Sequence, residues 1–303
     1  MSKEFYGNGK LLLTGEYAIL DGAKGLALPT SFGQYLKVRQ GTQNHMCWKS
    51  IDEHGKVWFD AEIDSTNLQL ISTSDTEIAE PLLNILKEAQ KLNSGFLAQN
   101  ERNLNIEARI TFPRDWGLGT SSTLIANIAA WANINPYRLL EASFGGSGYD
   151  IACATHNTAI TYIRNGHKPY IKEVDFNPDF ADQLFFVYLN QKQNSRDAIK
   201  RYRTLTIDKE QLIIKINALT DAILNCENLG EFEMLLNKHE ALLADTLGLP
   251  TIKSSLFPDY TNTIKSLGAW GGDFILATGK KTAMDYFRNK GYYTILPYTK
   301  MIL

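Results

Sequence analysis

Cysteine is scarce in this chain, and the sequence patterns of disulfide-rich, zinc-binding, membrane-spanning and secreted proteins are missing. Only three cysteines occur in 303 residues, and their spacing matches no metal site. We therefore expect neither a disulfide scaffold nor a zinc site, and we expect a reducing, cytoplasmic environment. There is no run of about 18 apolar residues and no basic-then-apolar order over residues 1–7, so neither a membrane span nor a signal peptide is expected.

Positive charge is not in excess either. The 31 Lys and Arg residues are outnumbered by 33 Asp and Glu, which gives a formal net charge of −2 and a pI of about 6.2. Nucleic-acid binding is therefore not expected. Apolar residues, by contrast, make up 44% of the chain, enough for a substantial core in one large domain or two ordinary ones. The sequence says nothing firm about oligomeric state, so a homodimer remains open.

Hydrophobic periodicity divides the chain into a strand-rich first half and a mainly helical second half. Alternation predicts half-buried strands at 57–63 and 104–111, and a 3.6-residue period predicts an amphipathic helix at 80–92. Asn135 and Pro136 are expected to cap and begin a short helix. Further strands are expected at 10–13, 25–29, 34–39, 184–189, 273–278 and 292–297, and further helices at 122–134, 208–226, 229–247 and 281–289. We expect an α+β fold with domains at 1–180 and 181–303.

A glycine-rich segment stands between the strand expected at 104–111 and the helix expected at 122–134. It reads Pro113-Arg114-Asp115-Trp116-Gly117-Leu118-Gly119-Thr120-Ser121-Ser122. Glycines let a backbone approach a ligand closely, and the unpaired N–H groups at a helix N-terminus suit a phosphate. The three hydroxyls can bond phosphate oxygens or coordinate Mg²⁺. The segment matches neither the Walker nor the dinucleotide pattern, and by itself a phosphate site and a plain helix cap are equally good interpretations.

Three more segments narrow the interpretation. They are Gly9-Lys10 followed by Gly15-Glu16, then Gly146-Ser147-Gly148-Tyr149-Asp150, and late in the chain Gly268-Ala269-Trp270-Gly271-Gly272-Asp273. In this order, and with the glycine-rich segment, they resemble the motifs of the GHMP kinase superfamily, which includes galactokinase, homoserine kinase, mevalonate kinase and phosphomevalonate kinase. The wording of the motifs is most similar to the phosphomevalonate kinase branch, and next to mevalonate kinase.

The resemblance implies a fold and a pair of cofactors. It implies an N-terminal domain like ribosomal protein S5, a ferredoxin-like C-terminal domain with helices on one face of an antiparallel sheet, and ATP with Mg²⁺ in the cleft between them. On this resemblance, Ser121 contacts Mg²⁺, and the ATP phosphates are bound by Pro113, Gly117, Leu118, Gly119, Thr120, Ser121 and Ser122.

Asp150 and Lys10 match the family's catalytic positions. Asp150 is expected to orient or deprotonate the acceptor hydroxyl, or to position an acceptor phosphate, and Lys10 to neutralise charge on the transferred group. Taken without the neighbouring motifs, Asp150 would be a helix N-cap and Lys10 a solvated lysine at a strand start. The resemblance further places these residues at the acceptor: Glu16, Ser147, Gly148, Arg196, Gly271 and Gly272. Glu16 is equally acceptable as a structural ion-pair partner.

Trp270 departs from the family pattern, because it replaces a glycine where the backbone is expected to approach the ligand closely. Its indole is large enough to fill part of the acceptor pocket, so the resemblance does not fix the acceptor. The acceptor is therefore either a small acid resembling mevalonate or phosphomevalonate, or a sugar or amino-alcohol. A catalytically silent nucleotide-binding regulator, and an unrelated α+β protein with chance glycine-rich loops, are the alternatives outside the enzyme class.

Overall fold

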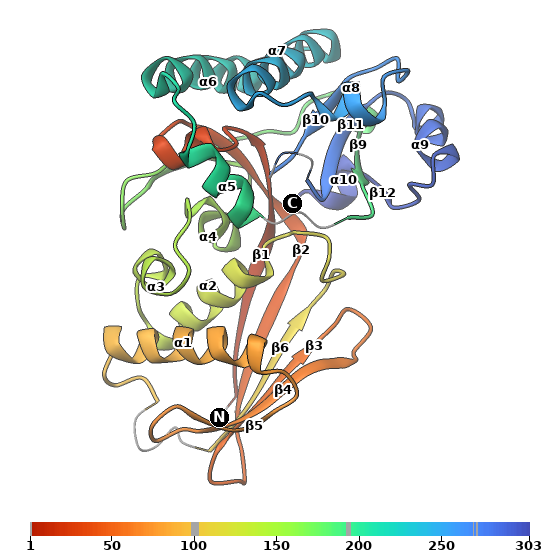
Figure 1. Ribbon diagram of the computed structural model, residues 1–303. Helices are drawn as coiled ribbons and strands as arrows, with labels where there is room; N and C mark the ends of the chain where they lie inside the picture. The colour runs from red at the N-terminus through yellow and green to blue at the C-terminus, as the bar shows by residue number, and fades with distance from the viewer. Residues whose placement is uncertain (1, 98–102, 192–194, 269, 271) are drawn as a thin grey trace.

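The computed structural model describes the whole chain except residues 1, 98–102, 192–194, 269 and 271 and the side chains of 195–197. Two β-sheets follow one another along the chain and form the lower and the upper right parts of Figure 1. The larger sheet precedes residue 174 and the smaller one begins at Leu184, so the α+β class is confirmed. The predicted division at residue 180 falls between the sheets, and independent domains on either side of it stay a prediction.

The larger sheet has eight strands in the described residues. In spatial order β5, β4, β3, β6, β2, β7 and β8 are neighbours, β1 pairs with β2, and only β3 and β6 run parallel. The strands are β1 (Ser2–Thr14), β2 (Gly25–Gln40), β3 (Met46–Ile51), β4 (Val57–Asp64), β5 (Gln69–Thr73), β6 (Leu104–Ile110), β7 (Ile160–Ile163) and β8 (Tyr170–Glu173). Every second residue of β6 is buried, which confirms the half-buried strand predicted there.

Helices from the first half of the chain cover one face of this sheet (Figure 1). They are α1 (Thr76–Leu92), α2 (Thr120–Ala132), α3 (Pro136–Ser143) and α4 (Tyr149–Ala154). Trp48 and Phe59 from the sheet pack with Leu86 of α1 and Ile128 of α2 in the largest core cluster. The Asn135 side chain accepts hydrogen bonds from two backbone N–H groups at the start of α3, so the predicted cap is confirmed.

The smaller sheet is antiparallel throughout, in the order β10-β11-β9-β12. Its strands are β9 (Leu184–Tyr188), β10 (Ile264–Ser266), β11 (Phe274–Thr278) and β12 (Ile295–Pro297). The accompanying helices are α5 (Ser195–Arg203), α6 (Lys209–Leu224), α7 (Leu229–Leu247), α8 (Ile252–Leu256), α9 (Asp285–Asn289) and α10 (Tyr298–Met301), with 3₁₀ turns η1 (Ala18–Asp21), η3 (Ala181–Gln183) and η4 (Lys281–Met284). Within the described residues, no helix is both long and apolar enough to cross a membrane.

Helices contribute to cores on both faces of the smaller sheet, whereas we expected them on one. Phe186 of β9 packs with α7 and α10, while its neighbour Val187 packs with α8 and α9. All five residues of β9 are buried, so each face of this strand requires a cover.

The first two strands are much longer than the sequence suggested, because glycine and proline lie inside them. Gly33 in β2 pairs with Asn8 in β1, and a Cβ at Gly33 would lie 2.3 Å from the carbonyl oxygen of the neighbouring Gly7. A glycine that seemed to end a strand therefore permits two strands to pair closely. The elements β3, β5, β7, β8, β10, α5, α8 and α10 were not predicted, and most of them span too few residues to show a clear period.

A buried cluster of charged side chains joins the end of β1 to the second half of the chain. Lys265 of β10 is fully buried, and its ammonium donates to a carboxylate oxygen of Glu16, just after β1. The same ammonium lies 3.0 Å from Glu240 of α7. His239 of α7 accepts a hydrogen bond of 3.1 Å from the backbone N–H of Gly15. One lysine thus holds two carboxylates from opposite halves of the chain, and we call this group the Lys265 clamp.

Electrostatics in the clamp follow from its burial. Burial raises the pKa of Glu16 to about 7, although Lys265 opposes the shift. Burial also disfavours the charge on Lys265, but Glu16 and Glu240 together outweigh it and raise the pKa of the ammonium. The pKa of His239 is lowered well below its usual value by burial and by Lys265, so this ring is neutral.

Replacing Lys265 with methionine is expected to destabilise the protein strongly and in a pH-dependent way. Two buried carboxyls lose their counter-charge, which costs about 3–5 kcal/mol of unfolding free energy. A carboxyl with a raised folded pKa destabilises the fold above its unfolded pKa and costs nothing below it. Because Lys265 lowers the Glu16 pKa, its removal raises that pKa further, so the loss of unfolding free energy should be larger at pH 8 than at pH 5 in urea denaturation.

The control for this measurement is Lys24→Met. Lys24 pairs with Asp221 at 2.6 Å on the surface, so its loss is expected to cost less than about 1 kcal/mol at either pH. Equal losses for the two variants would contradict the structural role assigned to the Lys265 clamp.

Candidate functional site

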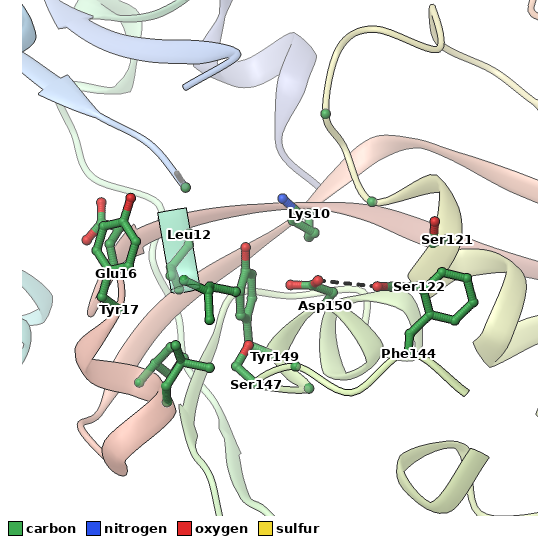
Figure 2. A pocket seen from close by; sticks show the side chains of 18 of the residues that line it. Lys10, Leu12, Glu16, Tyr17, Ser121, Ser122, Phe144, Ser147, Tyr149 and Asp150 are labelled. Atoms are coloured by element: carbon green, nitrogen blue, oxygen red, sulfur yellow. Dashed lines mark hydrogen bonds between the residues drawn. The ribbon is translucent and has the colours of Figure 1, made fainter. Parts of the chain in front are cut away.

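A cavity of about 690 Å³ lies where β1, α2, α4 and α5 meet. Its lining comes from five stretches of the chain, within 10–20, 114–125, 140–150, 199–204 and 267–274. The sequence motifs from both halves of the chain therefore converge on one space, part of which Figure 2 shows.

The glycine-rich segment forms one wall of the cavity. Gly117 and Gly119 have φ values of +65° and +92°, which side chains rarely permit. Gly119 is the N-cap of α2 and provides no side-chain hydrogen bond to the first turn. A Cβ at Gly117 would lie 1.7 Å from a carboxylate oxygen of Asp273, which comes from the second half of the chain. The wall therefore exposes backbone amides and helix-terminal N–H groups, as an anion site requires.

Lys10 lies against this wall. Its backbone N–H donates to the carbonyl oxygen of Leu118 at 3.1 Å. A Cβ at Gly119 would lie 3.2 Å from the Lys10 Cγ and 3.4 Å from its Cε, so the lysine stem runs directly along the loop. The ammonium is thereby directed along the wall of the cavity that it lines.

Asp150 lies in the first turn of α4, where Gly148 and not Asp150 is the N-cap. The Ser122 hydroxyl donates to Oδ2 of Asp150 at 3.2 Å, shown as a dashed line in Figure 2. The other carboxylate oxygen, Oδ1, is buried without a hydrogen-bond partner in the described part of the chain. Leaving such an atom unsatisfied costs about 1–3 kcal/mol, so its position is suited to a ligand that donates a proton or brings a cation.

These features fit a nucleotide with Mg²⁺. The glycine wall suits phosphate oxygens, the Ser121 hydroxyl is exposed at the cavity, and Asp150 has an unused oxygen. No three His, Cys, Asp or Glu side chains among the described residues form a ready-made metal cage. Mg²⁺ commonly keeps substrate phosphates and water among its ligands, so the exposed Ser121 hydroxyl is the candidate protein ligand, as the resemblance implied.

Comparison with known proteins gives matches in structure and none in sequence. No family model matches the chain, and no curated protein matches it. The mevalonate kinase of Methanococcus jannaschii superposes with a TM-score of 0.69 at 14% identity, over 98% of this chain and 97% of that one. Streptococcus pneumoniae phosphomevalonate kinase in complex with phosphomevalonate and AMPPNP gives 0.67 at 15% identity, over 97% and 99%. Lactococcus lactis galactokinase complexed with galactose gives 0.65 at 17%, over 95% and 88%.

This chain has the GHMP kinase fold. The similarity spans nearly the full length of the chain, and all three matched proteins belong to that superfamily. At such low identities the likeness establishes the fold, and the chemistry must be argued from the residues of this cavity.

Within the GHMP kinase fold of this chain, the segment 145–148 forms a second wall. The Tyr162 hydroxyl donates to the carbonyl oxygen of Ser147 at 2.6 Å. A Cβ at Gly148 would lie 2.8 Å from the same hydroxyl oxygen. Ser147 and Gly148 both line the cavity, as predicted, and their backbone is fixed from behind by Tyr162.

Glu16 lies at the edge of the cavity, but its carboxylate is engaged in the Lys265 clamp. Of the two roles open to it from sequence, the structural ion pair is the one that the contacts display. The next residue, Tyr17, has a φ of +61°, and its hydroxyl accepts a hydrogen bond of 2.6 Å from the backbone N–H of Trp270.

Several predicted site residues are not brought to the cavity. Leu118 is fully buried in the core, and Pro113 lies in the turn that precedes the glycine wall. Gly272 is buried outside the lining. Gly271 and the Arg196 side chain lie outside the described residues. The indole N–H of Trp270 donates to the Pro250 carbonyl oxygen at 2.9 Å, and the residue is not among the described lining residues.

A basic helix face at the cavity was missed from the sequence. Lys200 and Arg203 of α5 both line the cavity, and Ile199 and Thr204 flank them. The available signal was the spacing of the basic residues at 196, 200 and 203, which places them on one helical face. That spacing carries information only once 195–203 is known to be helical.

Gly117→Ala is expected to weaken ATP binding by about tenfold or more, equivalent to about 1.4 kcal/mol. The new methyl group would overlap the Asp273 carboxylate and strain a left-handed backbone. The measurement is the ATP·Mg²⁺-dependent shift in melting temperature, supported by calorimetric titration. Gly55→Ala is the control, because Gly55 also has a positive φ (+85°) but meets no atom within 4 Å. Similar ATP affinity in both variants would show that the glycine wall does not contact the nucleotide.

Proposed function

We propose that this chain is an ATP-dependent kinase that transfers the γ-phosphoryl group to a small anionic metabolite resembling mevalonate or phosphomevalonate. The observation that supports it most directly is the convergence of Lys10, Asp150 and the N-terminus of α2 on one cavity. A cation, a carboxylate with an unused oxygen and an anion-binding loop are the parts that phosphoryl transfer requires, since it depends mainly on positioning and charge neutralisation.

Each residue has a defined task in the proposed reaction. Bound ATP·Mg²⁺ supplies the phosphoryl group, whose bond to the β-phosphate oxygen breaks as a bond to the acceptor oxygen forms. Asp150 accepts the proton of an acceptor hydroxyl at Oδ1, while Ser122 holds Oδ2. For an acceptor phosphate, Asp150 positions the group instead. Lys10 balances the negative charge that gathers on the transferred oxygens.

Asp150→Asn is expected to lower kcat by roughly 10²–10⁴-fold, because the amide cannot accept the acceptor proton. The shape of the side chain and the Ser122 contact are retained, so the shift in melting temperature produced by ATP should persist. The measurement is ADP release from ATP·Mg²⁺ across mevalonate, phosphomevalonate, homoserine and galactose.

Three outcomes separate the alternatives. Turnover retained in Asp150→Asn would exclude Asp150 as the proton acceptor. ATP-dependent stabilisation without turnover on any acceptor would favour a silent nucleotide-binding regulator. Absence of stabilisation in the unaltered protein would mean that ATP is not a ligand and that the resemblance extends only to the fold.

The charge of the cavity favours an anionic acceptor over a sugar or amino-alcohol. Its lining carries four basic side chains, Lys10, Arg114, Lys200 and Arg203, against three carboxylates, Glu16, Asp150 and Asp273, and Glu16 is paired with Lys265. Neutral sugars do not need such a concentration of positive charge, whereas a carboxylate or phosphate does. A sugar is the second candidate, because galactokinase, which has a similar structure, was solved with galactose.

Replacing both Lys200 and Arg203 with alanine is expected to raise KM for an anionic acceptor by about tenfold or more, as loss of charge-assisted hydrogen bonds predicts. KM for ATP should change less. Arg201→Ala is the matched control, since Arg201 lies on the same helix but is not among the lining residues. If galactose is the substrate and the double variant leaves its KM unchanged, the sugar kinase alternative replaces the acidic one.

A further inference from the structure

Tyr149 lies between the two residues assigned to catalysis. It is the first residue of α4, immediately before Asp150, and lines the cavity although only 8% of its surface is exposed. Its ring packs in a core cluster with Leu12, which is on the same strand as Lys10 and two residues further along. Figure 2 shows Tyr149 beside Asp150 and below Lys10.

The Lys10 side chain is held at both ends. Its stem runs along Gly119, and its Nζ lies 5.7 Å from the centroid of the Tyr149 ring. An ammonium over the face of an aromatic ring is attracted by the ring's negative face within about 6 Å. Lysine has a flexible four-carbon stem, so two such contacts restrict it to few conformations.

We propose that Tyr149 is a positioning residue, whose aromatic ring holds the Lys10 ammonium where charge gathers during phosphoryl transfer. The inference rests on the proposed function for the role of Lys10, but the contact itself does not depend on it. In this scheme the ring of Tyr149 acts through Lys10.

The contributions of the Tyr149 ring and of its hydroxyl can be tested separately by substitution. The contact with the Lys10 ammonium is made by the face of the ring, with 5.7 Å from Nζ to the ring centroid, so the ring is assigned the task of holding Lys10. Phenylalanine should replace tyrosine in this task, whereas leucine, which has a similar apolar character but no π-system, should not.

Steady-state kinetics of two variants test the assignment. Tyr149→Phe is expected to keep kcat within about threefold, while Tyr149→Leu lowers it by roughly twofold to thirtyfold relative to Phe, as an attraction of about 0.5–2 kcal/mol allows. KM for ATP and for the acceptor should be similar in both, because a merely damaged cavity would raise them. Equal kcat values for the two variants would overturn the proposal.

The control variant is Tyr35→Leu. Lys37 lies over the Tyr35 ring at 5.9 Å, a similar contact on the large sheet away from the cavity. This variant should leave kcat within about twofold, because its lysine–tyrosine pair does not line the cavity.

A second measurement does not depend on activity. Lysines of the unaltered protein are reductively methylated with ¹³C, and the Lys10 signal is identified by its absence in Lys10→Arg. The ring should shift that signal upfield, and the shift should persist in Tyr149→Phe and disappear in Tyr149→Leu. An unshifted Lys10 signal in the unaltered protein overturns the inference, even if the leucine variant fails to fold. If the Lys10 signal shifts with the ring but the protein has no kinase activity, the contact between Lys10 and Tyr149 is confirmed and the proposed function is rejected.

Discussion

The contact of Lys265 with Glu16 and Glu240 is the interaction on which the arrangement of the site depends. A fully buried ammonium is tolerated only where opposite charge compensates its desolvation, and here the compensation comes from both halves of the chain. Glu16 lies just after β1, the strand that carries Lys10. The clamp therefore fixes the end of that strand relative to α7 and β10, and with it the position of the lysine at the cavity.

Close packing within the protein also determines which residues can form the glycine wall. Gly117 has no room for a side chain, because the Asp273 carboxylate occupies the position that a Cβ would take. At Gly119 a Cβ would lie 3.2 Å from the Lys10 stem, which is a tight contact, and the φ of +92° also disfavours a side chain. Both glycines are thus required by neighbours within the protein as well as by the approach of a phosphate. The loop would need these residues even before any ligand is considered.

The fold and the chemistry are supported by different observations. The fold is shared with kinases acting on mevalonate, phosphomevalonate and galactose, so it does not choose among acceptors. The choice rests on the side chains at the cavity. Lys200 and Arg203 add positive charge to it, while the indole N–H of Trp270 donates to the Pro250 carbonyl oxygen.

The sequence by itself determined the α+β class, the long periodic elements such as α1 and α7, and the phosphate-loop candidates, because periodicity and glycine-rich turns are local signals. It also placed Lys10, Asp150 and Ser121 at one site by resemblance. Only the tertiary structure decided that Glu16 is bound within the clamp and that Ser122 is the hydroxyl bonded to Asp150. Only the tertiary structure also showed that α5 lines the cavity and that the Tyr149 ring lies beneath Lys10. These contacts join residues far apart in the chain, and a local sequence pattern does not encode them.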